Sequence, residues 1–384
     1  MNNDFSLDLA SVSKELKFIF EILKMRNDSS KVLEKIPTDI NWVHFLELVK
    51  HHRLYPLIYS ILKKSNVKLI PSYIIQSLYR EYKANTFQML HLSAEMEQIS
   101  KLFTENKIRL LFLKGPVIAH ELYGDISLRT SKDLDIIIQM SDLKKTEELL
   151  LSFGYEREEN PTLLREWKWR HHHVTYFHPQ RKIQIEIHWR LNPFPSKEPS
   201  FNKLWDGKRL SMLTTYPVYF LGEEDLFLYL ISHGSRHGWF RLRWLTDIDQ
   251  MIRNGLCMKR IILLINKYQY HRIGGQAFIL ASQLLYTPID EKLSKLTLGQ
   301  YSRKLASESL SFIKEMSDFQ SPKKYMQSLK TNQQKVLSLL ISFYPRYMDS
   351  LTLRLPKPIH FLYFPLRPFL LIWRKMRKVV LPSR

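Results

Sequence analysis

Cysteine is nearly absent from this 384-residue chain, which contains only Cys257. An internal disulfide framework is therefore excluded, and a single cysteine fits a reducing compartment. No run of about 18 apolar residues occurs, so the sequence predicts no ordinary transmembrane helix. The first sixteen residues lack a basic segment followed by an apolar core, which argues against a signal peptide. These absences predict a cytoplasmic protein, either free or peripheral at the inner face of the membrane.

Acidic residues are scarce relative to basic ones. The chain contains 37 acidic and 58 basic residues and carries a net charge of +21. This excess indicates a polyanionic partner, such as nucleotide phosphates, nucleic acid, an anionic membrane or an acidic protein, although part of it can be solubilising surface. Hydrophobic residues make up 45% of the chain and aromatic residues 12%. A folded protein of two or three domains is expected.

Two of the few acidic residues open an apolar strand. Asp133 and Asp135 precede three isoleucines at 136–138, and they share one face because side chains alternate along a strand. A solvated strand edge is the simpler interpretation of such a pair. The apolar run after it favours a buried strand instead, and paired carboxylates suit a hard divalent cation.

A third acidic residue has a similar setting downstream. In the segment 182–189, Gln184, Glu186 and His188 lie on one face and isoleucines on the other. If this strand pairs with that of Asp133, three carboxylates converge and repel one another unless a cation such as Mg²⁺, or alternatively Mn²⁺, binds them. His188 is expected to orient a carboxylate or contact substrate, with a purely structural histidine as the alternative.

A glycine turn precedes these acids. Lys114 and Gly115 follow the apolar strand predicted at 108–113, and glycine lets a phosphate approach backbone N–H groups. The turn therefore predicts a phosphate-binding position.

Four short sequence motifs contain these residues and a later histidine- and tryptophan-rich segment. In chain order they are LKG, RTSKDLDI, IEIHW and HGSRHGWFRLRWLTDI. Their combination, spanning roughly residues 107–252, resembles a bacterial nucleotidyltransferase family of the DNA polymerase β superfamily. Members of that family accompany genes for peptide natural-product and polysaccharide biosynthesis. The resemblance implies an α+β fold with a mixed, polymerase β-like sheet flanked by helical regions. It also implies transfer of a nucleoside monophosphate from an NTP to an acceptor such as a peptide, sugar or small molecule, with pyrophosphate released.

The same resemblance implies roles for individual residues. Asp133 and Asp135 would be metal ligands and Glu186 the third carboxylate, which completes the site or accepts the acceptor's proton. The chain departs from the family's glycine–serine turn, because a proline follows Gly115. Phosphate contacts are then expected from backbone N–H groups and from four side chains, those of Lys114, Arg129, Ser131 and His188. The missing serine supports a competing hypothesis, a non-catalytic basic adaptor for RNA or membrane.

The chain is expected to divide into an N-terminal helical region at 1–105, a catalytic domain at 106–222, a helical domain at 223–348 and a basic aromatic tail at 349–384. The predicted helices include one that begins at Pro71, another at 86–101, one at 117–123, and one at 142–153 capped by Ser141. Besides 108–113, strands are predicted at 133–139, within 167–178, and at 183–190.

Two histidine groups are further candidates. In the run 171–173, consecutive histidines cannot all reach one ion from a strand, so one inward-facing histidine is expected rather than a zinc site. His233 and His237 are one helical turn apart, and with Arg241 and Arg243 they are candidate substrate contacts. The alternative makes Trp239 and Trp244 part of the core and pairs Asp247 with an arginine.

The tail contains no acidic residue after Asp349 but eight basic ones, interleaved with aromatic side chains. Pro365 and Pro368 are expected to break any long helix there. Such a composition suits an anionic membrane surface or single-stranded nucleic acid, or a tail that docks on the helical domain. Docking or membrane contact is favoured over nucleic acid.

Overall fold

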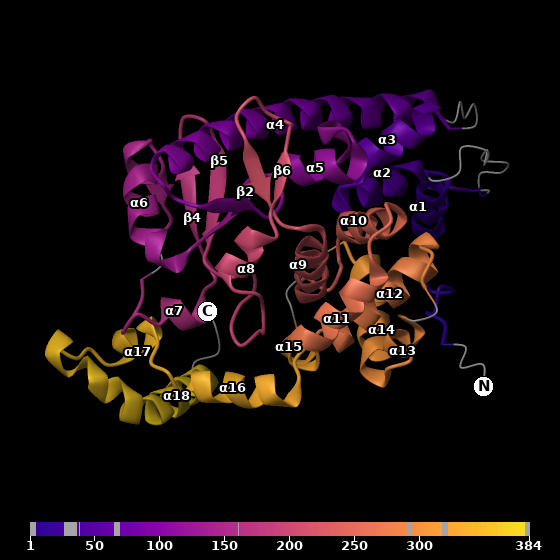
Figure 1. Cartoon of the computed structure of the whole chain (residues 1–384). Helices are drawn as coiled ribbons and strands as arrows, with labels where there is room; N and C mark the ends of the chain where they lie inside the picture. The colour runs from indigo at the N-terminus through magenta and orange to yellow at the C-terminus, as the bar shows by residue number, and fades with distance from the viewer. Residues whose placement is uncertain are drawn as a thin grey trace.

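The computed structural model describes residues 5–26, 37, 39–64, 70–159, 161–290, 293–316 and 322–380. Four helices come first: α1 Lys14–Met25, α2 Trp42–His51, α3 Tyr55–Lys64 and α4 Ser72–Glu105. The indigo and violet helices of Figure 1 form one end of the molecule, and α4 runs from there across the sheet. The two helices predicted from Pro71 and at 86–101 are thus one helix, because nothing between them interrupts α4.

A seven-stranded mixed sheet follows, with the order β3-β4-β5-β2-β1-β7-β6. Its strands are β1 Leu110–Phe112, β2 Asp133–Ile138, β3 Glu156–Arg157, β4 His173–His178, β5 Ile183–His188, β6 Arg209–Ser211 and β7 Val218–Phe220. β2 is antiparallel to β1 and parallel to β5. The strands predicted at 108–113, 133–139 and 183–190 are present with shorter ends. β6 and β7 are too short to give a periodic signal, and they were not predicted.

Local capping differs from the prediction at two places. The segment 140–142 is a 3-10 turn, η2 Met140–Asp142, before α6 Leu143–Ser152, and the Ser141 hydroxyl contacts Asp142 rather than capping the helix. The predicted strand region 167–178 begins with a short helix, α7 Trp167–Arg170, before β4 starts at His173.

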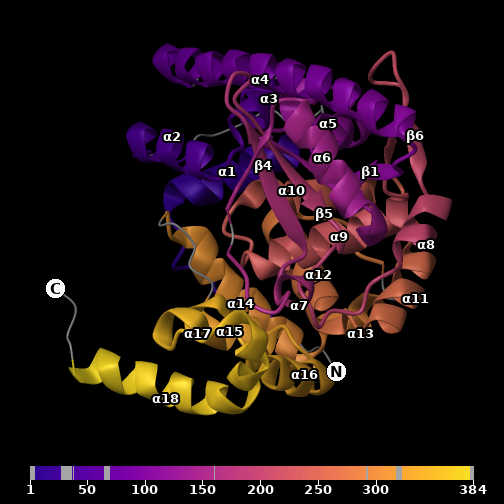
Figure 2. The same cartoon turned by 90° about the vertical axis from the view of Figure 1, so that its left-hand side faces the viewer.

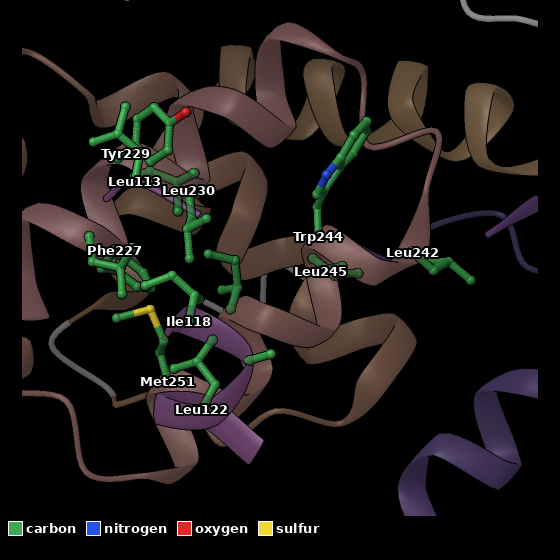
Figure 3. Packing of buried hydrophobic residues seen from close by; sticks show 14 of the residues in the cluster. Leu113, Ile118, Leu122, Phe227, Tyr229, Leu230, Leu242, Trp244, Leu245 and Met251 are labelled. Carbon is green, nitrogen blue, oxygen red and sulfur yellow. The ribbon is translucent and has the colours of Figure 1, made fainter. Parts of the chain in front are cut away.

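Helices on either side hold the central strands. α5 Pro116–Tyr123 follows β1, and its Ile118 and Leu122 pack toward Phe227 of α9 Glu223–Arg236 and Met251 of α10 Leu242–Arg253 (Figure 3). The α4 side chain Asn85 donates its amide to the carbonyl oxygens of Ser127 and Arg129, so α4 also fixes the chain just before β2. The start of β2 is therefore held between the N-terminal helices and α10.

The remaining helices lie beyond the sheet. They are α8 Phe201–Asp206, α11 Met258–Tyr268, α12 His271–Leu285, α13 Ser294–Thr297, α14 Gln300–Lys314, α15 Lys323–Ser328, α16 Asn332–Ser342, α17 Tyr347–Thr352 and α18 Tyr363–Val380. No helix in the described part of the chain combines the length and apolar character needed to cross a membrane.

The C-terminal helix corrects the prediction for the tail. α18 runs through both prolines for 18 residues and projects away from the body of the molecule (Figure 2). Pro365 falls in the first turn, where its missing N–H is not needed, so only Pro368 removes a hydrogen bond inside the helix. Packing of Tyr363 and Leu370 against Leu163 and an ion pair between Arg367 and Asp349 stabilise the helix despite that loss.

Candidate active site

The acids predicted to converge stand on neighbouring strands. Asp135 of β2 is in register with Glu186 of β5, and Asp133 is in register with Gln184. Because paired residues of adjacent strands point to the same side, Asp133, Asp135 and Glu186 share one face of the sheet. Leu134, between the two aspartates, is fully buried on the other face. The sheet therefore brings all three predicted carboxylates to one face, with Asp135 directly beside Glu186.

Two basic groups contact these acids. Lys114 places its Nζ atom 3.0 Å from Asp135 Oδ1. His188 Nε2 lies 3.3 Å from the same oxygen and 3.4 Å from Glu186 Oε2. Asp135, His188 and most of Lys114 are withdrawn from solvent, which strengthens these charge interactions. Of the two interpretations of His188, orientation of the carboxylates is the one that this geometry supports.

Burial and charge give the two aspartates different protonation. Burial, together with the neighbouring charge of Asp135, raises the pKa of Asp133 to about 6. Burial also acts to raise the pKa of Asp135, but Lys114 and His188 outweigh it, and the pKa of Asp135 falls well below its usual value. For His188, burial acts to lower the pKa, yet hydrogen bonding to Asp135 and Glu186 raises it. Asp135 is therefore firmly ionised, whereas the pKa of Asp133 lies much closer to neutral pH.

These residues fit a divalent cation. Asp135, Glu186 and His188 each offer a ligand atom, and the three atoms lie within 4.8 Å of one another. Asp135 Oδ2 and His188 Nδ1 are buried without a hydrogen-bond partner in the described part of the chain. Carboxylate oxygens suit Mg²⁺ or Mn²⁺.

The histidine run contributes more than the sequence predicts. His172, His173 and His188 also bring ligand atoms within 4.8 Å of one another, and His173 Nε2 is 3.8 Å from Glu186 Oε2. Only His171 is exposed, so two histidines face the cluster instead of the one expected. The chain bends at His172, whose carbonyl oxygen accepts a hydrogen bond from the backbone N–H of Trp189, and the rings of His172 and His173 lie 4.5 Å apart. The sequence alone could not show that His172 and His173 lie close to His188, because this depends on the pairing of β4 with β5.

The glycine turn has the expected backbone. Gly115 has φ +94°, a conformation that favours glycine, and its Cβ position would touch Leu134 at 3.4 Å. The following proline starts α5, where its missing N–H is harmless. Ser131, predicted to contact phosphate, instead donates its hydroxyl to the carbonyl oxygen of Asp133. It thus braces the start of β2.

Arg129 does not face the acids as predicted for a phosphate ligand. It is buried and forms a two-pronged ion pair with Asp247 of α10, at 2.9 Å between Nη2 and Oδ2. Tyr123 also donates its hydroxyl to Asp247, at 2.9 Å. The alternative in which Asp247 pairs with an arginine is the one observed, and the pair joins the loop before β2 to the helical region.

The other histidine group is a packed aromatic cluster. The rings of His233 and His237 are 4.7 Å apart, and each lies 5.2 Å from Trp244. Burial, and then the nearby Arg236, lowers the pKa of His237 to about 3, so this imidazole is neutral at pH 7. Trp239 is fully buried. Both tryptophans are thus core, and the two histidines are half-buried at the end of α9.

The predicted substrate contacts Arg241 and Arg243 have structural partners. Arg243 donates to the backbone and hydroxyl oxygens of Thr130, and Arg241 donates to the carbonyl of His51. Arg241 also lines a pocket with Arg53, a residue that the sequence did not single out. Nothing in the helical periodicity around Arg53 marks it, because only the tertiary fold brings it near Asp133.

The chain was compared with protein families, with curated proteins and with solved structures. Residues 38–286 match the family described as "Uncharacterised nucleotidyltransferase". No curated protein matches the chain. Among solved structures, the antibiotic-resistance factor ANT(2'')-Ia is similar at 9% identity and a TM-score of 0.35, covering 48% of this chain and 92% of that one. A nucleotidyltransferase-like antigenic protein from Paracoccidioides brasiliensis is similar at 16% identity and a TM-score of 0.31, covering 52% and 94%. Because the family match spans more than half of the chain, this protein belongs to the uncharacterised nucleotidyltransferase family.

Proposed function

We propose that the protein transfers a nucleoside monophosphate from an NTP to an acceptor and releases pyrophosphate. The observation that carries the proposal is the register of β2 and β5, which sets Asp135 beside Glu186 with His188 and Lys114 in contact. In this reaction an acceptor oxygen or nitrogen bonds to the α-phosphorus, and the bond from that phosphorus to the pyrophosphate oxygen breaks. The acceptor, whether peptide, sugar or another small molecule, belongs to the proposal as well.

Asp133, Asp135 and Glu186 would hold one or two Mg²⁺ or Mn²⁺ ions. When bound, such ions neutralise phosphate charge and align the attacking and leaving oxygens. His188 and Lys114 orient Asp135, and Lys114 adds positive charge close to the phosphates. Glu186 completes the ligand set or accepts the proton that leaves the acceptor.

The experiment that tests this proposal is a screen of the four NTPs with pyrophosphate detection, with Mg²⁺, with Mn²⁺ and with EDTA. Candidate acceptors are the products of neighbouring biosynthetic genes. Metal-dependent pyrophosphate release that requires both an NTP and an acceptor supports transfer. A nucleoside diphosphate product would indicate phosphoryl transfer instead. NTP affinity that does not change with metal would favour the non-catalytic basic adaptor.

We also propose contact between the C-terminal helix and an anionic membrane surface. One face of α18 packs on the protein through Tyr363 and Leu370. Another leaves apolar side chains in solvent at helical spacing, with exposed fractions of 70% for Phe369, 55% for Ile372 and 53% for Trp373. Exposed aromatic and aliphatic groups beside basic residues suit the headgroup region of a bilayer, and the absence of acidic residues after 349 suits anionic lipid.

Replacing Ile372 and Trp373 together by serine is expected to release the protein from vesicles. In co-sedimentation with phosphatidylserine-containing vesicles, we expect binding to fall at least about tenfold, because both apolar groups would leave the bilayer. A matched control is Leu263→Ser, an exposed leucine on α11 outside the tail. Equal binding by wild type and the double variant would refute the membrane contact, and a concentration-dependent dimer would assign the face to a second copy.

A further inference from the structure

A basic pocket lies next to the start of β2. It has a volume of about 630 Å³ and is enclosed by the turn between α2 and α3, by α4, and by the segment 130–132. Its charged lining consists of four basic side chains and one acidic one: Lys50, Arg53, Lys132, Arg241 and Glu81. Lys50 and Glu81 pair at 2.7 Å and cancel one another. The pocket therefore keeps a surplus of positive charge directly beside Asp133.

Arg241 provides one charge of that surplus, and Arg53 and Lys132 provide the other two. Neither Arg53 nor Lys132 has an ion-pair partner among the residues that the structure describes. Arg53 is half-buried, and the acidic group that most favours its charge is Asp133. Lys132 is exposed and immediately precedes Asp133. A half-buried cation without a carboxylate partner is costly, so its position favours an anionic ligand.

Two other cations that were expected to contact phosphate are already engaged. Lys114 is bound to Asp135, and Arg129 to Asp247. A phosphate chain that reached the acids would therefore find two further cations without a carboxylate partner in this pocket, Arg53 and Lys132. The N-terminal helical region would supply one of them, Arg53.

The pocket is also held in shape. Arg53 has φ +55°, a left-handed conformation that is unusual for arginine, and its N–H donates to the carbonyl of Lys50 in the turn after α2. Arg241 donates to the carbonyl of His51, which ties this turn to the start of α10. On the opposite wall, Asn85 holds the carbonyl oxygens before β2. Unusual backbone conformation kept by surrounding contacts is typical of ligand sites.

We infer that this basic pocket binds a phosphate group of a substrate through Arg53 and Lys132. The inference rests on the proposed nucleotidyl transfer and deepens it, because it assigns phosphate recognition to a pocket formed partly by the N-terminal helices. Two sources share this chemistry: the pyrophosphate portion of the NTP and a phosphate carried by the acceptor. Either one would extend from the pocket toward Asp133.

Titration with inorganic pyrophosphate in EDTA tests the pocket without the metal site. Using calorimetry on the full-length protein, we expect Arg53→Ala to weaken binding at least about tenfold, since a charge-assisted hydrogen bond is lost. Lys132→Ala is expected to weaken it by a smaller factor because Lys132 is exposed. Arg53→Lys keeps the charge and should retain most of the affinity. Lys101→Ala, an exposed lysine of α4 that does not line the pocket, is the matched control.

A second arm separates the two sources. If Arg53→Ala lowers the affinity for ATP in Mg²⁺ as much as the affinity for pyrophosphate, and adenosine binding is unchanged, the pocket holds the NTP phosphates. If ATP affinity is unchanged while pyrophosphate binding falls, the pocket serves a phosphorylated acceptor.

Unchanged pyrophosphate affinity in the folded Arg53→Ala, Lys132→Ala double variant would overturn the inference. A wrong transferase proposal would give a different result. The wild-type protein would then show no metal-dependent NTP binding and no pyrophosphate release, but the pocket would still bind added pyrophosphate.

Discussion

Asp135→Asn is expected to reduce nucleotidyl transfer by at least about 10³-fold, the largest effect of any single substitution in this site. Asparagine has nearly the same shape, so the loss isolates the charge of a carboxylate that also contacts Lys114 and His188. The measurement is pyrophosphate release at saturating NTP and metal. Asp142→Asn, an acidic residue in η2 outside the site, is the control. Wild-type rates in Asp135→Asn would remove Asp135 from the mechanism.

Asp133 and Asp135 are expected to affect the stability of the metal-free protein in opposite ways. Asp135→Asn leaves Lys114 without its buried partner, which costs about 3–5 kcal/mol of unfolding free energy. Asp133 is the opposite case, because its pKa is raised to about 6 in the folded protein. Its protonated form favours folding, so it stabilises fully below about pH 4, and that contribution is lost as pH rises through about 6.

Asp133→Asn removes this dependence, and at pH 8 in EDTA we expect it to be at least as stable as wild type. Urea unfolding at pH 5 and pH 8 measures both changes. Loss of the carboxylate charge is therefore expected to spare the fold at Asp133 but not at Asp135.

Asp247→Asn is expected to destabilise the protein by about 3–5 kcal/mol, measured by urea unfolding at pH 7. The substitution leaves Arg129 charged and unpaired. This is costly because the side chains of Arg129 and Asp247 are only 1% and 0% exposed. It also weakens the hydrogen bond from Tyr123. The effect is on stability first, because the pair joins the loop before β2 to α10 and does not contact the acids.

Replacing both partners provides the sharper test of this pair. Arg129→Met with Asp247→Leu removes both charges, and most of the stability should return. Glu148→Gln, which breaks the exposed pair with Lys144, is a control for which no measurable change is expected. A double variant as unstable as Asp247→Asn would show that packing, and not the unpaired charge, dominates.

Much of the central sheet could be predicted from the sequence. β5 carries apolar residues at alternate positions over its six residues, and β2 places Leu134 between two aspartates before three isoleucines, patterns specific enough to fix which acids share a face. The acids Asp135 and Glu186 follow from that pattern once the strands are assumed to pair. The short strands β6 and β7 could not be found this way, since three residues give no period.

The partners of the basic residues could not be predicted. Lys114 and Arg129 were expected to contact phosphate and Arg243 to contact substrate, yet Lys114 binds Asp135, Arg129 binds Asp247 and Arg243 binds Thr130. Each of the last two partners lies more than one hundred residues away in the chain. Conversely, Arg53 had no distinguishing local pattern, and its importance comes from its position beside Asp133.

The sequence by itself indicated the family through the resemblance of its motifs, and it determined which face of each strand the acidic residues share, because that depends on local alternation. Only the tertiary structure decided which cations remain uncompensated, which histidines reach the acids, and where the basic pocket lies. Charges interact through space over a few ångströms, irrespective of chain separation. Their pairing is therefore settled by packing between elements rather than by the pattern within any one of them.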